Sequence, residues 1–486
     1  MSDGKLALFG GPPVRDRAFI VEPMVDDDEE RLVLDAIRAK SFSRYIGSTG
    51  PTIETTLRMT SAEAAEISDY WHFLGGPHVR AFAAELSRDF DVPYAVPVNA
   101  ATMGLGVALA ACGVGPGDEV ILPAISFSAT ASAVLLFNSI PVFVDVDPDT
   151  FCMDPAKVEA AITPRTRAIL PVHLTGNIAD MDAILAIARR HRLRVVEDAA
   201  QCIGATYNGR KAGTLGDAGV FSFNQSKNIM TGEGGMLVTR DPEIARRARL
   251  IVNHGEVVFD DRHGVEDLAN MVGLNLRLPE LCAAVGRAQL AKLDAVNAWR
   301  TKNARQLRRG LAGTPGLRLP TDQADGNGPM RAVPHLFVAL YDRDAMRAPR
   351  GAFVAALRAE GVPVGTGYVR ALYEAPTFLK RIAFGARGCP WTCGAAPSDV
   401  TYKRGQCPVA ERLLEDEFLW FYHIAYPSTP ADMDDIVRAV RKVAAAREEL
   451  AKVDLGALAA KSQGRLAGRG VAGDQIAGPR QTTTNP

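Results

Sequence analysis

Residues 220–239 read VFSFNQSKNIMTGEGGMLVT, in which a polar, glycine-rich stretch joins two short apolar runs. Short apolar runs that are rich in β-branched and aromatic residues and bounded by such stretches are typical of buried strands. The pattern predicts a strand that ends near Phe223, a turn that contains Lys227, and another strand after the glycines. Lys227 then lies at the end of a strand, where open α/β sheets bind their ligands.

A second polar group follows a strand-like run upstream, in RVVEDAAQCIGA at residues 194–205. The run ends in Glu197 and Asp198, and Gln201 follows three residues after Asp198. The carboxyl ends of parallel strands meet at one edge of a sheet, so we expect Asp198 and Lys227 to lie close together.

Between about residues 93 and 241, short apolar runs alternate with helical stretches. Continuous apolar strands separated by helices indicate βαβ units and a mostly parallel sheet. We therefore predict an α/β fold with a mostly parallel central sheet and helices on both of its faces. The predicted strands are 94–98, 119–122, 141–146, 168–172, 194–196 and 220–223, and the predicted helices include 105–112 and 181–191.

The pattern changes after a long predicted helix at residues 279–300. Beyond it, a strand is predicted at 333–341 and helices are predicted at 353–360 and 433–452, which indicates a smaller α+β domain. The glycine-, proline- and cysteine-rich residues 385–407 are expected to form a loop.

We accordingly predict three parts in the chain. Residues 1–300 comprise an N-terminal arm and the large cofactor-binding domain, and residues 301–453 form the small C-terminal domain. Residues 454–486 are rich in Gly, Ala and polar side chains, which bury too little apolar surface to fold, so a disordered tail is expected there.

The overall composition is that of an ordinary globular protein. The 486 residues include 55 Lys and Arg and 56 Asp and Glu, for a formal net charge of −1. This balance gives neither the basic footprint of a nucleic-acid-binding protein nor a polybasic membrane signal. No apolar stretch approaches the roughly 18 residues of a membrane span, and the N-terminus lacks the apolar core of a signal peptide, so we expect a cytoplasmic protein.

The cysteines and histidines do not predict a metal site. The seven cysteines are sparse and odd in number, which favours reduced thiols over a disulfide framework. Cys389, Cys393 and Cys407 lack the second close pair or the nearby histidine of a usual zinc site, so a structural loop is favoured. For His173 and His254, core and site-edge roles both stay open.

A lysine and a carboxylate at the rim of one sheet suit pyridoxal phosphate. This cofactor needs an amine for its internal Schiff base and an acid that keeps the pyridine nitrogen protonated, so that the ring acts as an electron sink. Lys227 supplies the amine and Asp198 supplies the acid. Lys227 must lose a proton to react, and burial and nearby positive charge would assist that loss.

The phosphate and the ring of this cofactor have candidate partners too. The sequence VPVNAATMGLGVALA at residues 96–110 runs from a strand into a helix and places Ala100, Ala101 and Thr102 at the helix N-terminus. Such a terminus presents free N–H groups and a favourable dipole to an anion. Phe127, in LPAISFSAT after the next strand, is placed to cover a flat ring.

Each of these residues has a plainer interpretation. Lys227 alone is a surface lysine, Asp198 a helix cap, and Phe127 a core side chain. The strand before Lys227, the GEGG after it and Asp198 upstream together favour the cofactor.

The sequence resembles the DegT/DnrJ/EryC1/StrS group of sugar and cyclitol aminotransferases, within the fold-type I pyridoxal-phosphate enzymes. The resemblance runs from roughly residue 34 to residue 452. Its strongest matches are GVGPGDEVILPAISFSATASAV (113–134), PVFVDVDPDTF (141–151), PVHLTGN (171–177), VEDAAQ (196–201), FSFNQSKNIMTGEGG (221–235) and GLNLRLPELCAAVGRAQL (273–290).

Matched position by position, the resemblance implies catalytic roles for two residues. Lys227 forms the Schiff base and later shuttles the proton between the substrate carbon and the cofactor, while Asp198 pairs with the pyridinium nitrogen. Gln201 approaches the cofactor's ring oxygen, and Phe127 stacks on the ring.

The resemblance also implies how the phosphate is held. Ala101, Thr102 and Ser222 contact it. Asn275 matches the family asparagine that reaches the phosphate of the neighbouring subunit, which implies a homodimer with shared sites. An ordinary turn or cap role for Asn275 is the alternative.

The chain departs from the family pattern in three places. The family usually has Ser-Gly-Thr where residues 100–102 are Ala-Ala-Thr, and it usually has tyrosines at the positions of Leu274 and Leu276. There is also additional chain at residues 52–71. These differences concern substrate choice more than cofactor binding. The NQSK and GEGG sequences, together with the downstream GTGYVRALYEAPTF, most resemble the cyclitol and aminobenzoate-type branch.

The implied reaction moves an amino group from an amino acid, L-glutamine or L-glutamate, to a keto-sugar or keto-cyclitol. One alternative is a dehydratase or aromatising synthase on the same scaffold. Family members that only dehydrate can carry histidine in place of the lysine, whereas this chain keeps Lys227. The other alternative is a non-catalytic regulator that binds the cofactor or a sugar, and the retained Lys227, Asp198 and Gln201 argue against it.

Overall fold

The computed structural model describes residues 5–47, 53–69, 71–255, 272–321, 328–368, 370–393, 397–454 and 456. The tail predicted at 454–486 therefore lies almost entirely outside the described residues, as do parts of 52–71 and of the loop predicted at 385–407.

The centre of the larger part of the molecule is a seven-stranded sheet in the order β1-β9-β8-β5-β4-β2-β3. All neighbouring strands run parallel except β9, which is antiparallel to both β1 and β8. The prediction of a mostly parallel sheet is confirmed. The strands are β1 (Tyr94–Val98), β2 (Glu119–Pro123), β3 (Ile140–Val144), β4 (Thr166–Ile169), β5 (Arg194–Asp198), β8 (Ala218–Ser222) and β9 (Gly235–Thr239).

Helices cover both faces of this sheet, because successive strand side chains point to opposite sides. In β2, for example, Val120 and Leu122 belong to one apolar core and Ile121 to another. The first core also takes in α5 (Ala101–Ala111), α6 (Ser128–Leu135) and α9 (Pro242–Val252). The second takes in α4 (Pro77–Asp89), α7 (Pro155–Ala160), α8 (Met181–His191) and α10 (Glu280–Ala291).

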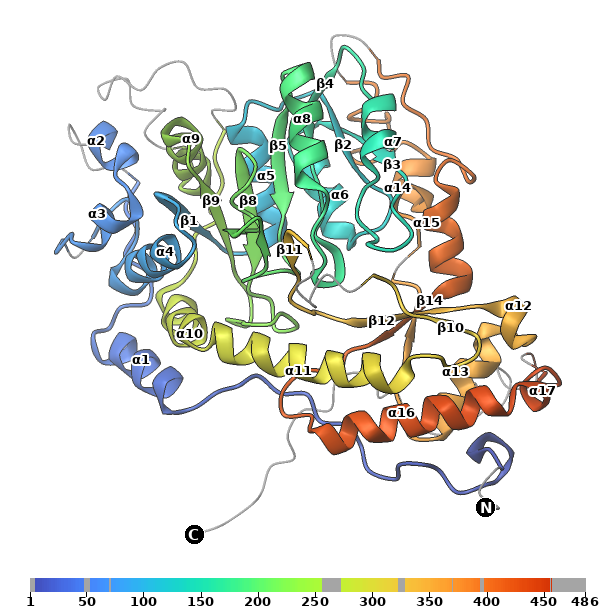
Figure 1. The fold of residues 1–486 in the computed structure, drawn as a ribbon. Coiled ribbons are helices and arrows are strands. Elements are labelled where there is room, and N and C mark those ends of the chain that lie inside the picture. The colour runs from blue at the N-terminus through green and yellow to red at the C-terminus, as the bar shows by residue number, and fades with distance from the viewer. Residues whose placement is uncertain are drawn as a thin grey trace.

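A smaller antiparallel sheet follows in the C-terminal part, with the strand order β10-β12-β14-β13. Its strands are β10 (Leu317–Arg318), β12 (Phe337–Tyr341), β13 (Gly365–Thr366) and β14 (Phe418–Phe421). The helices α11 (Leu293–Leu311) and α16 (Pro430–Ala445) pack side by side below it (Figure 1). We propose that the two domains divide within α11, near residue 300.

The remaining elements are short or peripheral. They are η1 (Ala7–Phe9), α1 (Asp27–Arg38), α2 (Ile53–Arg58), α3 (Ser61–Ala65), η3 (Leu174–Gly176), β6 (Thr206–Tyr207), β7 (Arg210–Lys211), β11 (Met330–Arg331), α12 (Arg343–Met346), α13 (Arg350–Ala359), η6 (Leu372–Glu374), α14 (Pro376–Leu379), α15 (Pro408–Arg412), the π-helical turn η7 (Leu413–Glu417) and α17 (Arg447–Leu450).

The single helix predicted at residues 279–300 is wrong, because the chain forms two helices there. The break is at Lys292 (φ −96°, ψ 0°), the residue that follows α10 and precedes α11. The Lys292 ammonium lies 2.6 Å from the Asp26 carboxylate and 2.5 Å from that of Glu29. These contacts tie the break to the N-terminal arm, which no local pattern could have indicated.

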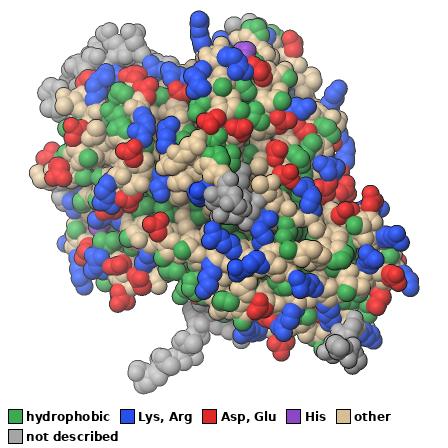
Figure 2. All heavy atoms as spheres, in the orientation of Figure 1, with side chains coloured by type: hydrophobic (Ala, Val, Ile, Leu, Met, Phe, Trp, Pro, Cys, Tyr) green, Lys and Arg blue, Asp and Glu red, His purple; other side chains and the backbone are tan. Residues whose placement is uncertain are grey.

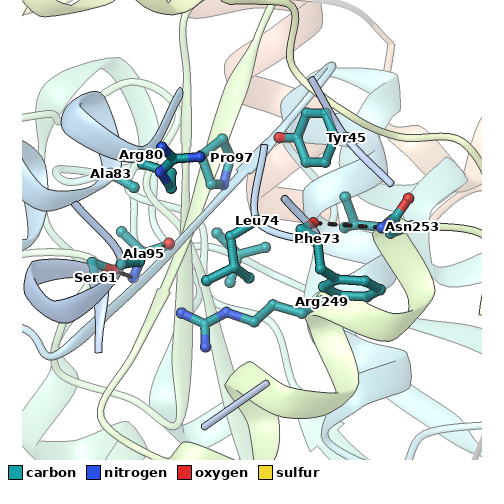
Figure 3. Close-up of a pocket in the computed structure, with 13 residues that line it drawn as sticks. Tyr45, Ser61, Phe73, Leu74, Arg80, Ala83, Ala95, Pro97, Arg249 and Asn253 are labelled. Atoms are coloured by element: carbon teal, nitrogen blue, oxygen red, sulfur yellow. Dashed lines mark hydrogen bonds between the residues drawn. The ribbon is translucent and has the colours of Figure 1, made fainter. Parts of the chain in front are cut away.

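The additional chain before β1 is held by buried arginines. Arg249 of α9 donates hydrogen bonds of 2.7 Å to the carbonyls of Leu57 and Met59. Arg80 of α4 donates to the carbonyl of Ile67 at 2.8 Å. Both arginines line a cavity of about 30 Å³ between this segment and β1, shown in Figure 3. The cavity lies apart from the residues predicted to hold the cofactor.

The cysteines depart from the sequence expectation at one pair. Cys389 and Cys393 form a disulfide, with their Cα atoms 5.2 Å apart, within the range that this bond requires. The two cysteines are four residues apart in the sequence, and the conformation of the loop brings them together. The other five cysteines are free thiols, as expected.

The surface carries both signs of charge. Figure 2 shows Lys and Arg side chains interspersed with Asp and Glu over one face of the molecule. Within the described residues, no helix combines the length and the apolar character that a membrane span requires.

Candidate active site

A cavity of about 1300 Å³ opens between the carboxyl ends of β5 and β8 and the small sheet. Residues of β13 and β14 line it from the other side, among them Thr366 and Trp420. The predicted site residues that meet in this cavity are Ala101, Thr102, Phe127, Asp198, Gln201, Ser222 and Lys227.

Lys227 lies in the turn that follows β8, as the sequence predicted. Its backbone N–H donates a hydrogen bond of 2.9 Å to the carbonyl of Asn224, which closes the turn. Burial lowers the pKa of the Lys227 amine; the Asp198 carboxylate opposes this effect, and the Arg300 guanidinium adds to it. The net lowering leaves more of the amine unprotonated near neutral pH, which is the form that attacks a carbonyl.

Asp198 is the last residue of β5 and is 6% exposed. Its Oδ2 accepts a hydrogen bond of 2.7 Å from the Thr130 hydroxyl, and its Oδ1 accepts one of 3.2 Å from the N–H of Ala200. Ser126 Oγ lies 2.6 Å from Thr130 Oγ1. Since Thr130 uses its proton on Asp198, Ser126 donates to Thr130, and the two hydroxyls hold the carboxylate in one orientation.

The N-terminus of α5 faces the cavity with its first residues, Ala101 and Thr102. Ala100 precedes the helix in an extended conformation, and its side chain cannot cap the first N–H groups. These N–H groups are therefore left for an anion. Thr102 and Ser222 line the same cavity. Gly235 of β9 keeps the neighbouring backbone close, because a Cβ there would lie 2.8 Å from the nitrogen of Ala101.

Phe127 and Gln201 both line the cavity, but Phe127 is exposed and Gln201 is buried. The Phe127 ring is 58% exposed, so it is free to cover a bound ring and is not a core side chain. Gln201 accepts a hydrogen bond of 2.8 Å from the N–H of Thr175 and donates one of 2.7 Å to the Tyr368 hydroxyl. Burial raises the pKa of Tyr368 to about 12, so its hydroxyl keeps its proton at neutral pH.

The structure does not bring Asn275 into this cavity. Asn275 is exposed, and its side-chain oxygen accepts a hydrogen bond of 2.9 Å from Arg277 Nε. The two histidines left open by the sequence are now placed. His173 is fully buried, with its Nε2 atom 2.9 Å from Glu197. His254 contacts Arg277 through Nε2 at 3.2 Å.

Sequence reasoning missed four residues at or behind the cavity. Thr130 follows Phe127 by three residues in a matched motif, so the helical spacing could have indicated it. Tyr368 lies in the quoted GTGYVR stretch. His335 and Tyr422 line the cavity from the small sheet, and no spacing relates them to Lys227.

These residues fit pyridoxal phosphate. The cofactor needs an amine of lowered pKa, a carboxylate, an anion cradle and an aromatic cover. Lys227, Asp198, the start of α5 and the exposed ring of Phe127 supply these four groups around a single cavity. The cavity volume leaves room for a substrate beside the cofactor.

Two curated relatives are similar to this chain over nearly its whole length. An L-glutamine:2-deoxy-scyllo-inosose aminotransferase of Streptoalloteichus tenebrarius is 37% identical over 449 residues, which cover 90% of this chain and 97% of the relative. An L-glutamine:scyllo-inosose aminotransferase of Streptomyces griseus is 38% identical over 451 residues, covering 91% and 98% of the two chains.

The fold also resembles solved structures. The crystal structure of an aminotransferase from Psychrobacter cryohalolentis matches with a TM-score of 0.72 and 27% identity, over 88% of this chain and 100% of that one. The family model of the DegT/DnrJ/EryC1/StrS aminotransferases matches residues 55–399. This chain therefore belongs to the DegT/DnrJ/EryC1/StrS aminotransferase family.

Proposed function

We propose that this chain is a pyridoxal-phosphate aminotransferase that moves an amino group from L-glutamine to a keto-cyclitol. The observation that carries the proposal is the meeting of Lys227, Asp198 and the start of α5 on one cavity. The chain is also similar, over nine-tenths of its length, to aminotransferases named for L-glutamine and inososes.

The chain's own residues account for the proton movements of such a reaction. Bound pyridoxal phosphate supplies a carbonyl carbon that takes up nitrogen and a ring that withdraws the electrons left by a departing proton. Lys227 would hold the cofactor through its amine and, once displaced by the donor, would remove and return the proton at the reacting carbon. Asp198 would hold a proton on the ring nitrogen, with its carboxylate oriented by Thr130.

The other cavity residues would bind and orient. The N–H groups at the start of α5, with the hydroxyls of Thr102 and Ser222, would hold the phosphate. Phe127 would cover the ring. Gln201, fixed by Thr175 and Tyr368, would approach the ring oxygen.

Assembly and location are part of the proposal. We infer a homodimer in which Asn275 serves the site of the neighbouring subunit, because this exposed residue lies outside the cavity of its own chain. We also infer that the enzyme works in the cytoplasm.

Reduction with borohydride tests the role of Lys227. The reagent fixes a cofactor that is bound to a lysine, and peptide mass spectrometry should then find the added mass on Lys227. Lys227→Ala should lose both the added mass and at least about 10⁴-fold in turnover, because the amine both holds the cofactor and moves the proton. Lys380→Ala, which changes an exposed lysine, is the matched control and should behave as the parent chain. Cofactor found on any other lysine would overturn the assignment.

Isotope transfer tests the reaction itself. The chain is incubated with cofactor, a keto-inositol and L-glutamine labelled with ¹⁵N at the amino group. An aminocyclitol that carries the label supports the proposal. L-Glutamate is tested in place of L-glutamine as the donor, and keto-sugars are tested in place of the keto-inositol as acceptors. Loss of water from the acceptor without gain of ¹⁵N would identify a dehydratase. The absence of any amino-acid turnover would identify a regulator.

A further inference from the structure

We propose that Arg300 is a positioning residue for Lys227: its buried guanidinium, which no described carboxylate pairs with, contacts His335 and Tyr422 beside the turn that carries the amine and keeps that amine reactive. This inference deepens the proposed function and rests on Lys227 being the cofactor lysine. Arg300 belongs to α11 and is not among the residues that line the cavity.

Arg300 is an unusual cation because it is buried and has few partners. It is 3% exposed, and its guanidinium carbon lies 5.5 Å from the centre of the Tyr422 ring. Its NH1 donates a hydrogen bond of 3.0 Å to the carbonyl of His335, and the guanidinium also forms a hydrogen bond with the Tyr422 side chain, whereas its Nε has no hydrogen-bond partner. Across the described ranges, no Asp or Glu pairs with it. A buried charge without a counter-ion is costly, so a structural role alone explains it poorly.

Both chain neighbours of Lys227 are tied to the surroundings of Arg300. The Tyr422 hydroxyl donates a hydrogen bond of 2.6 Å to the carbonyl of Ser226. On the other side, the Asn228 side chain lies 3.3 Å from His335 Nδ1 and donates a hydrogen bond of 2.9 Å to Asn297, one turn before Arg300 on α11. The turn that carries Lys227 is therefore fixed against the element that carries the guanidinium.

The charges that face Lys227 come from several elements. Asp198 on β5 favours the protonated amine, and Arg300 on α11 favours the neutral amine. His335, which precedes β12, adds no positive charge, because burial, Lys227 and Arg300 all lower its pKa. Arg300 thus opposes the effect of Asp198 on the pKa of Lys227. A nearby cation is a known means of activating a lysine in a poorly hydrated pocket.

The test measures the ionisation of Lys227 directly in the full, cofactor-free chain. Trace acetylation with isotope-labelled acetic anhydride at a series of pH values, read by peptide mass spectrometry, reports the midpoint for each lysine. In the parent chain, the Lys227 midpoint should lie below the ordinary lysine value of about 10.4. Arg300→Gln removes the charge but keeps an N–H donor for the His335 carbonyl, and it should raise the midpoint by about one pH unit.

Two variants and one internal reference make the outcome decisive. Arg300→Lys keeps the charge and should leave the midpoint within about 0.3 pH units of the parent value. The exposed Lys380 should be unchanged in every protein. If Arg300→Gln lacks the parent circular dichroism and melting temperature, Arg300→Met serves as the second neutral variant.

Each result has a defined meaning. A parent midpoint at the ordinary lysine value, or a folded neutral variant with an unmoved midpoint, overturns the role of Arg300. Because the measurement needs neither cofactor nor turnover, it is separate from the borohydride test. If the cofactor is found on Lys227 but the Lys227 midpoint does not move in the neutral Arg300 variant, only the role of Arg300 is contradicted.

Discussion

The hydroxyl of Thr130 donates a hydrogen bond to the carboxylate of Asp198, with 2.7 Å between Oγ1 and Oδ2. Thr130 is on α6 and Asp198 ends β5, so the contact joins a helix to the strand end that faces the cavity. The Ser126 hydroxyl forms a hydrogen bond with the Thr130 hydroxyl, with 2.6 Å between Oγ and Oγ1. This pair of hydroxyls sets the direction in which Asp198 presents its charge.

Replacing Thr130 with Val should weaken cofactor binding by roughly 10- to 100-fold. The change keeps the shape of the side chain and removes a hydrogen bond to a charged group, which is worth about 1.5–3 kcal/mol. The dissociation constant of pyridoxal phosphate, measured by absorbance titration, checks the prediction. Thr130→Ser keeps the hydroxyl and should stay within about threefold of the parent chain. Equal affinities for the Val and Ser variants would mean that the contact does not orient Asp198.

Replacing Glu197 with Ala should destabilise the fold by about 3–5 kcal/mol, the usual effect of breaking a buried charged network. Glu197 is fully buried and accepts hydrogen bonds from the N–H groups of Gly213, Leu215 and Gly216. It also lies 2.9 Å from His173 Nε2. Urea unfolding measures the effect. Glu448→Ala, at an exposed position, should change the free energy of unfolding by less than about 0.5 kcal/mol. A similarly small change at Glu197 would contradict the structural role of this carboxylate.

The stability of the chain should fall as the pH drops from about 6.5 to about 4, in part because of His423. Burial, with a contribution from Arg15, lowers the pKa of His423 to about 4. Between the two pH values the unfolded chain binds a proton that the folded chain does not, so unfolding is favoured progressively as the pH falls. The full effect is about 3 kcal/mol.

Replacement of His423 with Gln isolates this contribution. The free energy of unfolding of both proteins is measured in urea at pH 7.5 and pH 4.5. Between these values the parent chain should lose more stability than the variant. An identical pH dependence for both proteins would show that His423 does not titrate differently in the folded state.

Replacing Arg249 with Leu should loosen the additional segment before β1. The change leaves the carbonyls of Leu57 and Met59 without their donor, and α2 should open more often. Trypsin cleavage after the nearby Arg58 should then be about tenfold faster, corresponding to about 1.4 kcal/mol of lost local stability. Arg247→Leu, on the same helix and paired with Glu243, is the control. Cleavage that is equally slow in both variants would show that Arg249 does not hold the segment.

The sheet was predictable because its evidence is local. Short runs of three to six residues between helical stretches identified the main strands, and the same pattern placed Lys227 and Asp198 at strand ends. The position of Phe127 after the next strand indicated it as a ring cover, and the resemblance to a known family added the roles of Gln201 and Ser222. The fold brings all three residues to the cavity.

Other features were not predictable because they depend on contacts between distant segments. At the break between α10 and α11, Lys292 contacts Asp26 and Glu29, which are far away along the chain. The hydrogen bond between Gln201 and Tyr368 joins residues whose sequence spacing carries no periodic signal.

The sequence by itself determined the α/β architecture and the placement of one amine and one carboxylate at the same edge of the sheet, because hydrophobic periodicity and strand-end position are properties of short segments. Only the tertiary structure decided which charges surround that amine. Arg300 reaches the neighbourhood of Lys227 through α11, and the ionisation of a buried group depends on every charge that packing brings near it, whatever their separation along the chain.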